Sequence, residues 1–248
     1  VPDTRERMRE TVDGLLPDDA TGGTPLGKRL FGNAGTLLAL GSVTAPVSNW
    51  VASSRPVRAF LERVAGVDRR RDLPELRRET LVEWFDARGG PRVSESAARR
   101  EAVLYPDAYT NHALVDRGKA AVETLEALGV RVRVPEVPES GRAPLSQGMV
   151  STAERRAEAV AAALAPHLDA GRDVVAVEPS DLAMFRDDYE RLLAPEMAAR
   201  VSTNSYELFE YVYGLLENGS PLYALDGGDD RLALHTHCQQ RTLGLDCY

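Results

Sequence analysis

The chain has 248 residues, of which 43% are hydrophobic and 27% are charged, a balance typical of a folded protein with a real core. Its formal net charge of −8 argues against a general nucleic-acid binder, because such a protein needs a basic surface opposite the phosphates. The two cysteines, Cys238 and Cys247, cannot form a disulfide framework, so a reducing compartment such as the cytoplasm is expected.

Residues 30–54 carry no charged side chain, and this stretch is long enough to raise the question of a membrane span. Glycine, serine, asparagine and proline residues interrupt it and make insertion less favourable than an unbroken apolar run would. The pattern therefore favours a buried or peripheral helical hairpin that bends at Pro46.

The rest of the N-terminal region is also expected to be helical. Apolar residues at three-and-four spacing predict amphipathic helices over residues 57–67 and 76–85, with Pro74 at the start of the second. The pattern is then broken by Gly89, Gly90 and Pro91. We therefore expect a domain boundary near residue 92.

From residue 93 onward, short apolar strands alternate with helices. Strands are predicted over residues 102–105, 130–134, 174–177 and 232–235. Helices are predicted over residues 114–128, 151–168 and 206–216, with another beginning near Ser180. Ser151 and Glu154 have the spacing of a capping box, and arginines alternate with valines in the second strand, which suggests a sheet edge.

This alternation predicts an α/β fold, a parallel sheet with helices on both faces. In such sheets ligands bind beyond the carboxyl ends of the strands. Four short motifs fall in loops at the predicted strand ends. They are Tyr-Pro-Asp-Ala-Tyr-Thr-Asn at residues 105–111, Gly-Arg-Ala-Pro-Leu-Ser-Gln-Gly at 141–148, Glu-Pro-Ser-Asp at 178–181 and His-Thr-His-Cys-Gln-Gln-Arg at 235–241.

In the same order, these four loops resemble those of the cysteine-rich CCG iron–sulfur domain, although the second exchanges the proline and alanine of the family pattern. Residues 66–74 also resemble the linker that joins a two-cluster ferredoxin domain to this domain. Such linkers occur in FAD-linked oxidoreductases of the D-lactate, glycolate and 2-hydroxyglutarate dehydrogenase type. The resemblance covers residues 56–245 and is weaker before them.

The resemblance implies that residues 1–92 are a helical linker region following an absent ferredoxin-type domain. It implies that residues 93–248 are a CCG-like domain truncated in its second repeat. The full-length protein would then carry FAD and 4Fe–4S clusters. Its expected partners are the ferredoxin-type and FAD-binding domains of the same polypeptide and a quinone or other membrane-associated electron acceptor. Its expected place is the cytoplasm or the inner face of the membrane.

The departures from the family pattern fall at the cluster ligands. Family cysteines are replaced by Ala108, by Glu139 and Ser140, and by Asp181. Because iron–sulfur clusters require thiolate ligands, we expect no conventional cluster in this first repeat.

Cys238 alone matches a family ligand, and its remaining partners would lie beyond the end of this sequence. His235 and His237 are further candidate metal ligands beside it. The alternative is a strand-end thiol flanked by structural histidines. Cys247 matches no family ligand and is interpreted as incidental.

The carboxylates at the strand ends suggest a second hypothesis, a metal or acid–base site built from Asp107, Glu139, Glu178 and Asp181. A structural interpretation is favoured, in which Asp181 caps the following helix with Ser180 and Glu139 lies on a solvated loop.

Besides a carboxylate-based metal enzyme that would use Asp107 and Asp181, two functions remain open. The first is the electron-transfer part of an FAD- and iron–sulfur-dependent oxidoreductase that oxidises a 2-hydroxy acid, a part that is not catalytic alone. The second is a non-redox structural or protein-interaction domain that has lost its cluster ligands.

Overall fold

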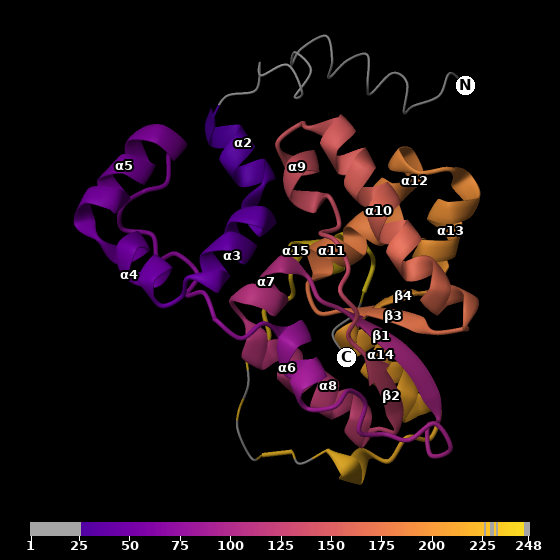
Figure 1. The fold of residues 1–248 in the computed structure, drawn as a ribbon. Helices are drawn as coiled ribbons and strands as arrows, with labels where there is room; N and C mark the ends of the chain where they lie inside the picture. The colour runs from indigo at the N-terminus through magenta and orange to yellow at the C-terminus, as the bar shows by residue number, and fades with distance from the viewer. Residues whose placement is uncertain (1–25, 226, 229–230, 232, 246–248) are drawn as a thin grey trace.

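The computed structural model describes residues 26–225, 227–228, 231 and 233–245. Its centre is a parallel sheet of four strands in the order β2-β1-β3-β4 (Figure 1). The strands are β1 (Arg100–Tyr105), β2 (Val130–Arg133), β3 (Asp173–Ala176) and β4 (Ser205–Glu207). The predicted α/β class and the parallel sheet are confirmed.

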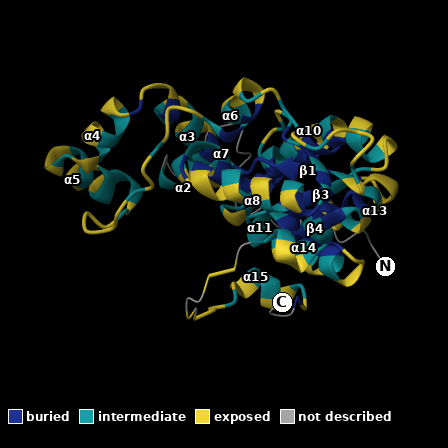
Figure 2. Ribbon diagram, turned by 90° about the horizontal axis from the view of Figure 1, so that it is seen from below, coloured by how far each residue is buried: buried dark blue, intermediate teal, exposed yellow. Residues whose placement is uncertain are grey.

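Helices cover both faces of the sheet, because successive side chains of a strand point to opposite sides and the central strands are apolar on both. On one face, Ala102, Leu104 and Val175 share a core with α6 (Leu81–Ala87), α8 (Val115–Ala127) and α14 (Leu208–Glu217). On the other, Val103, Tyr105 and Val174 share a core with α10 (Val150–Asp169), η2 (Met184–Asp188), α12 (Tyr189–Leu192) and α13 (Pro195–Thr203). Figure 2 shows the buried strands between these two helical layers.

The second strand lies at an edge of the sheet, as predicted. Its valines are buried, whereas Arg131 and Arg133 keep partial exposure and each forms an ion pair with Glu101 on β1. Gly129 ends the preceding helical segment with a positive φ of 85°, a backbone conformation that glycine adopts without strain.

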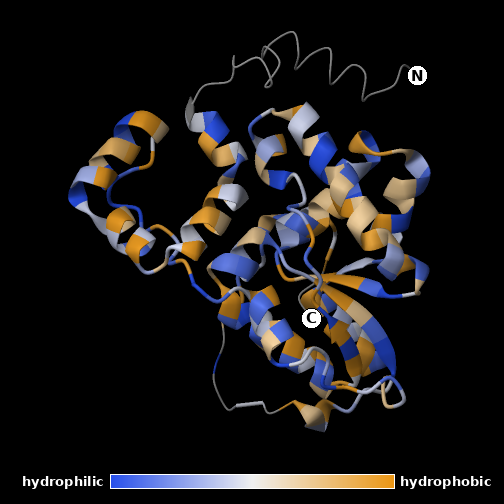
Figure 3. Ribbon diagram, viewed as in Figure 1, coloured by the Kyte–Doolittle hydropathy of each residue, from blue (hydrophilic) through white to orange (hydrophobic). Residues whose placement is uncertain are grey.

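Four helices form an arm beside the sheet. They are α2 (Leu26–Gly32), α3 (Ala34–Val43), α4 (Val47–Ser53) and α5 (Arg55–Ala65). The predicted bend at Pro46 is present, with a cis Ala45–Pro46 peptide between α3 and α4. Neither α4 nor α5 buries a residue, and Figure 3 shows apolar positions along this arm. Among the described residues, no helix is both long and apolar enough to cross a membrane.

The described chain has five further short helices. They are α7 (Ala108–His112), α9 (Arg142–Ser146), α11 (Pro179–Ala183), η3 (Leu222–Ala224) and α15 (Cys238–Thr242). Three of them follow the sheet strands directly: α7 follows β1, α9 follows β2 and α11 follows β3. They place the strand-end motifs at the carboxyl edge of the sheet.

The prediction of a strand over residues 232–235 is wrong, since its described residues, 233–235, form no strand. The fourth strand is β4, which pairs with β3 through Ser205, Tyr206 and Glu207. Main-chain hydrogen bonds define this short strand. The apolar pattern did not predict it, because its buried residues Ser205 and Glu207 are polar.

Two predicted helix starts are also wrong. Pro74 begins no helix; α6 starts after Thr80, whose side chain forms a capping box with Glu83. Asn49 holds the backbone at Leu76 out of a helix through two hydrogen bonds, of 2.8 and 2.9 Å. The expected box at residues 151–154 lies inside α10, whose N-cap position is one residue before Val150.

Candidate functional site

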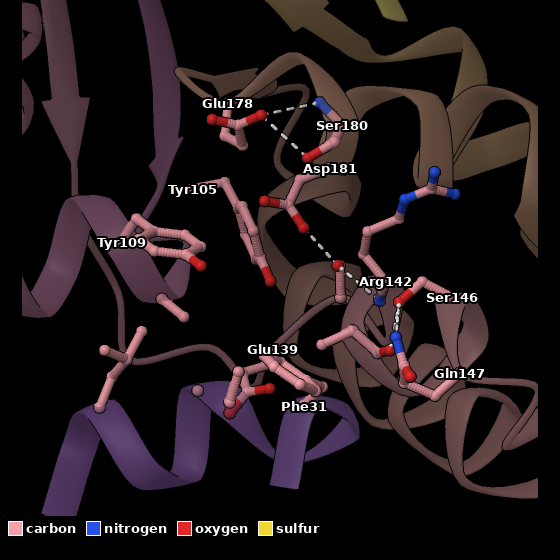
Figure 4. Close-up of a pocket in the computed structure, with 16 residues that line it drawn as sticks. Phe31, Tyr105, Tyr109, Glu139, Arg142, Ser146, Gln147, Glu178, Ser180 and Asp181 are labelled. Atoms are coloured by element: carbon pink, nitrogen blue, oxygen red, sulfur yellow. Dashed lines mark hydrogen bonds between the residues drawn. The ribbon is translucent and has the colours of Figure 1, made fainter. Parts of the chain in front are cut away.

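A cavity of about 290 Å³ lies at the carboxyl edge of the sheet, where the strand-end loops meet α2 and α3 of the arm (Figure 4). All four positions at which family cysteines are replaced line it, namely Ala108, Glu139, Ser140 and Asp181. These positions are far apart in the sequence, and the parallel strands bring them together. The expected gathering at one edge is therefore confirmed for the first three loops, whereas the described fourth motif, residues 235–241, follows no strand and does not line the cavity.

Ser140 connects the loops after β2 and β3. Its hydroxyl donates a short hydrogen bond to the Asp181 carboxylate and accepts one from the Arg142 backbone N–H at 3.1 Å. The buried Tyr189 hydroxyl donates to the Ser140 carbonyl at 2.9 Å. The buried Tyr105 hydroxyl donates to the Pro138 carbonyl at 2.9 Å. The loop is thus fixed from the core side, and Asp181 is held at the cavity wall.

Asp107 lies between Tyr105 and Ala108, both of which line the cavity. Its Oδ1 caps α7 by accepting from the N–H groups of Tyr109 and Thr110, at 3.0 and 2.9 Å. The residue is only 2% exposed, and its Oδ2 has no hydrogen-bond partner among the described residues. An unpaired buried carboxylate oxygen is costly, so this atom requires an explanation.

The two aspartates influence each other. Burial raises the pKa of the Asp181 carboxyl well above its ordinary value, and the neighbouring Asp107 charge raises it further, against the hydrogen bond from Ser140. Burial also raises the pKa of Asp107, opposed by the hydrogen bonds that it accepts from Thr110.

Glu139 does not lie on a solvated loop, so that prediction is wrong. It is half-buried, lines the cavity and forms an ion pair with Arg156 of α10. Gly35 of α3 lets the arm approach this pair, because a Cβ there would clash with the Glu139 carboxyl group. Burial raises the pKa of Glu139 more than the Arg156 charge lowers it.

The expected cap at Asp181 is wrong as well. Glu178 is the N-cap of α11 and accepts from the backbone N–H of Ser180 at 3.3 Å and from its hydroxyl at 2.9 Å. Pro179 follows at the first helical position, where its missing N–H costs nothing. Asp181 therefore does not cap the helix, and its carboxylate accepts the hydrogen bond from the Ser140 hydroxyl.

The three predicted ligand residues, His235, His237 and Cys238, lie on one segment. Their side chains are not grouped around a position where they could hold one metal ion. His237 caps α15, its Nδ1 accepting from the Gln239 N–H at 3.2 Å, and its Nε2 lies 3.9 Å from Glu178. Cys238 is exposed at the first position of α15, and His235 is exposed outside any helix or strand. Cys247 lies outside the described residues.

The described residues do not fit an iron–sulfur cluster in the cavity. The side chains at the ligand positions are alanine, serine and two carboxylates already engaged with Arg156 and Ser140, and none supplies a thiolate. Within the described part of the chain, no three His, Cys, Asp or Glu side chains are grouped so as to hold a metal ion. The assignment of Cys238, His235 and His237 as ligands stays a prediction.

Sequence reasoning missed the aromatic wall and the cation of this site. Phe31 of α2 and Tyr109 line the cavity, and Arg156 reaches Glu139 from the middle of α10. Tyr109 lies within one of the strand-end motifs and could have been included on that ground. Phe31 and Arg156 carry no local signal, since their roles depend on how the arm and α10 pack.

Comparison with known proteins gives a distant similarity to one kind of redox protein. The chain is 23% identical over 218 residues to a subunit of the anaerobic glycerol-3-phosphate dehydrogenase of Escherichia coli, in both strain K12 and O157:H7. The alignment covers 84% of this chain and 53% of each relative, so the chain spans about half the length of the curated relatives it matches. No family model matches. No solved structure gives a significant match either. The chain is therefore distantly similar to part of an oxidoreductase.

Proposed function

We propose that this chain is the electron-transfer, acceptor-side part of an FAD- and iron–sulfur-dependent oxidoreductase whose substrate is a 2-hydroxy acid. The observation that carries the proposal is the similarity over 84% of the chain to a dehydrogenase subunit. Three strand-end motifs that resemble CCG loops support it, because residues from all three line one cavity. In this proposal the chain is not catalytic alone.

The cofactors belong to the full-length protein in this account. FAD would accept the hydride of the hydroxy acid, and 4Fe–4S clusters would pass single electrons onward. Cys238 would be a ligand of a cluster completed by other segments, since the cavity residues offer no thiolate. Its exposure at the start of α15 leaves it accessible to such segments.

The arm supplies a surface for partner domains. Large apolar side chains lie exposed on α3 and α4, whereas a folded monomer normally keeps such patches small. They are Leu40 (65% exposed), Val43 (75%), Val47 (62%) and Trp50 (73%). We propose that ferredoxin-type and FAD-binding domains cover this surface, and that the assembled protein works in the cytoplasm or at the inner face of the membrane with a quinone as acceptor.

The test is a substrate survey on the full-length gene product, purified without oxygen. We expect bound flavin, iron–sulfur absorbance, and dye reduction with one of D-lactate, glycolate or 2-hydroxyglutarate. Activity with glycerol 3-phosphate and none of these acids would replace the substrate class but keep the redox role. Absence of both flavin and iron would contradict the proposal.

A second candidate is a non-redox interaction domain. The hydrogen bonds that join Asp181, Ser140 and Tyr189 favour it, because they stabilise the loops without any metal. If the full-length protein holds no iron and Cys238→Ser changes nothing measurable, this interpretation replaces the first.

A further inference from the structure

Three arginine side chains surround one carboxylate beside the edge strand β2. The Nε atoms of Arg131 and Arg133 lie 3.4 and 3.7 Å from the carboxylate oxygens of Glu101. The Nε of Arg172 donates to the same carboxylate at 2.5 Å. Glu101 and Arg131 are register partners on β1 and β2, and Arg133 lies two residues further along the same face. Arg172 directly precedes β3, so β1, β2 and β3 all contribute to this arginine cluster, and none of the four residues lines the cavity.

The arginine cluster carries an excess of positive charge. Its three guanidinium groups stay protonated, and Glu101 offsets one of them, so three positive charges against one negative charge leave a net charge of +2. The four side chains keep only 18–36% exposure, so salt and water screen their repulsion less than at an open surface. The chain as a whole has a net charge of −8. A second anion would therefore stabilise this positive group within an acidic protein.

Two of the arginines have unused donors that a ligand can reach. Arg131 is engaged, since its Nη1 donates to the Val93 carbonyl at 3.0 Å. Within the described part of the chain, Arg133 donates no hydrogen bond, and Arg172 donates only through its Nε. Unlike the Arg133 Nε, which is buried, the terminal nitrogens of these two side chains are open to solvent. Forks of guanidinium N–H groups are the donors that bind oxyanions best.

The end of α10 brings an imidazole to the same place. The Arg172 backbone N–H donates to the His167 carbonyl at 3.1 Å, which holds the loop before β3 against the last turn of α10. Burial lowers the pKa of the His167 imidazole, and the charges of Arg172 and Arg133 lower it further. The ring therefore lies near both guanidinium groups and is neutral at neutral pH. A neutral imidazole has one N–H donor, which can bind an anion.

We propose that Arg133 and Arg172, with His167 beside them, bind a phosphate dianion at this edge of the sheet. Phosphate brings two negative charges, which match the excess, and its oxygens can accept from both guanidinium groups at once. A monocarboxylate would leave half of the excess unbalanced. Arginines that only protect a sheet edge from pairing would need no contribution from Arg172, which comes from the far side of β1. The proposal does not depend on the redox function.

The experiment is calorimetric titration of the full chain at constant ionic strength near pH 8, where phosphate is mainly a dianion. The probe is sodium phosphate, with sodium acetate as the monoanion and sodium sulfate as a competitor of the same charge and shape. We expect saturable phosphate binding, displacement by sulfate, and acetate binding weaker by about tenfold or more. Saturation by methyl phosphate as well would support a phosphate ester as the natural ligand, and saturation by phosphate alone would support the free ion. No saturable phosphate binding, or acetate binding as tightly as phosphate, would overturn the proposal.

Two variants locate the site and one serves as control. Arg133→Gln removes one guanidinium, so phosphate affinity should fall by about tenfold. Glu101→Gln removes the competing negative charge, so phosphate affinity should rise. Arg117→Gln removes the same charge from an exposed position on α8 and should bind as the wild type does. Thermal melting shows that each variant is folded at the assay temperature. Unchanged affinity in Arg133→Gln, an equal loss in Arg117→Gln, or no gain in a folded Glu101→Gln would contradict the proposal.

Discussion

Replacing Arg156 by methionine tests how the arm is fixed to the site. The guanidinium of Arg156 pairs with Glu139 and also donates to Asn33 at 3.2 Å and to Thr36 at 3.4 Å. It therefore connects α10 to the strand-end loop and to the first turn of α3 in the arm, including its N-cap residue Asn33. Methionine keeps the apolar stem and removes these polar contacts.

The magnitude follows from those contacts. A hydrogen bond to a charged group contributes about 1.5–3 kcal/mol. The longer hydrogen bonds from the same guanidinium to the neutral side chains of Asn33 and Thr36 add little. The Arg156 and Glu139 side chains keep 20% and 22% exposure, which lowers the figure through solvent screening. We expect the free energy of unfolding to fall by about 2 kcal/mol, which is about 4–8 °C in melting temperature for a domain of this size.

The assay is urea unfolding and calorimetry of Arg156→Met beside Arg155→Met. Arg155 is the adjacent residue, is exposed, and contacts the Thr152 hydroxyl at 2.9 Å, so its replacement should cost about 0.5 kcal/mol or less. Limited proteolysis should cut residues 26–65 faster in Arg156→Met alone. Equal losses in the two variants would refute the reasoning that Arg156 fixes the arm.

Two further predictions concern buried charge. Burial and Asp107 raise the pKa of Asp181 in the folded state, so this group contributes stability at low pH that is lost as pH rises through its folded pKa. The melting temperature of Asp181→Asn minus that of the wild type should therefore be larger at about pH 8 than at about pH 5. A difference that is the same at both pH values would contradict this reasoning. Arg88→Met should cost about 3–5 kcal/mol in urea unfolding, because both partners of the Arg88–Glu126 pair are only 7% exposed and Glu126 would be left unpaired. Adding Glu126→Gln should recover part of that loss, and a double variant as unstable as the single one would contradict the pairing argument.

The strand pattern shows what the sequence can predict. The valines of β2 alternate with arginines, and the central strands are short apolar runs, so periodicity alone places them. The apolar pattern does not predict strand β4, because two of its buried side chains are polar. One of them, Glu207, is 2% exposed, and its carboxylate caps α14. A pattern of apolar residues cannot identify a strand whose stability comes from main-chain pairing and a buried cap.

The site divides in the same way. The carboxyl ends of parallel strands meet at one edge, so the convergence of Ala108, Ser140 and Asp181 could be predicted from their loops alone. The residues that these loops contact elsewhere in the chain could not be predicted from the sequence. Arg156 lies 120 residues or more from its contacts on the arm, and Asn49 fixes Leu76 from 27 residues away. Only the packed fold reveals such contacts, which explains why Glu139 was expected on a solvated loop.

The iron content of the full-length protein, purified anaerobically as wild type, Cys238→Ser and Asp181→Asn, tests the central claim most directly. The account predicts iron–sulfur absorbance in the wild type, a loss of one cluster's iron in Cys238→Ser, and unchanged iron in Asp181→Asn. That outcome would place a cluster at Cys238 and none in the cavity. A wild type without iron, or an Asp181→Asn variant that loses iron as Cys238→Ser does, would contradict the account.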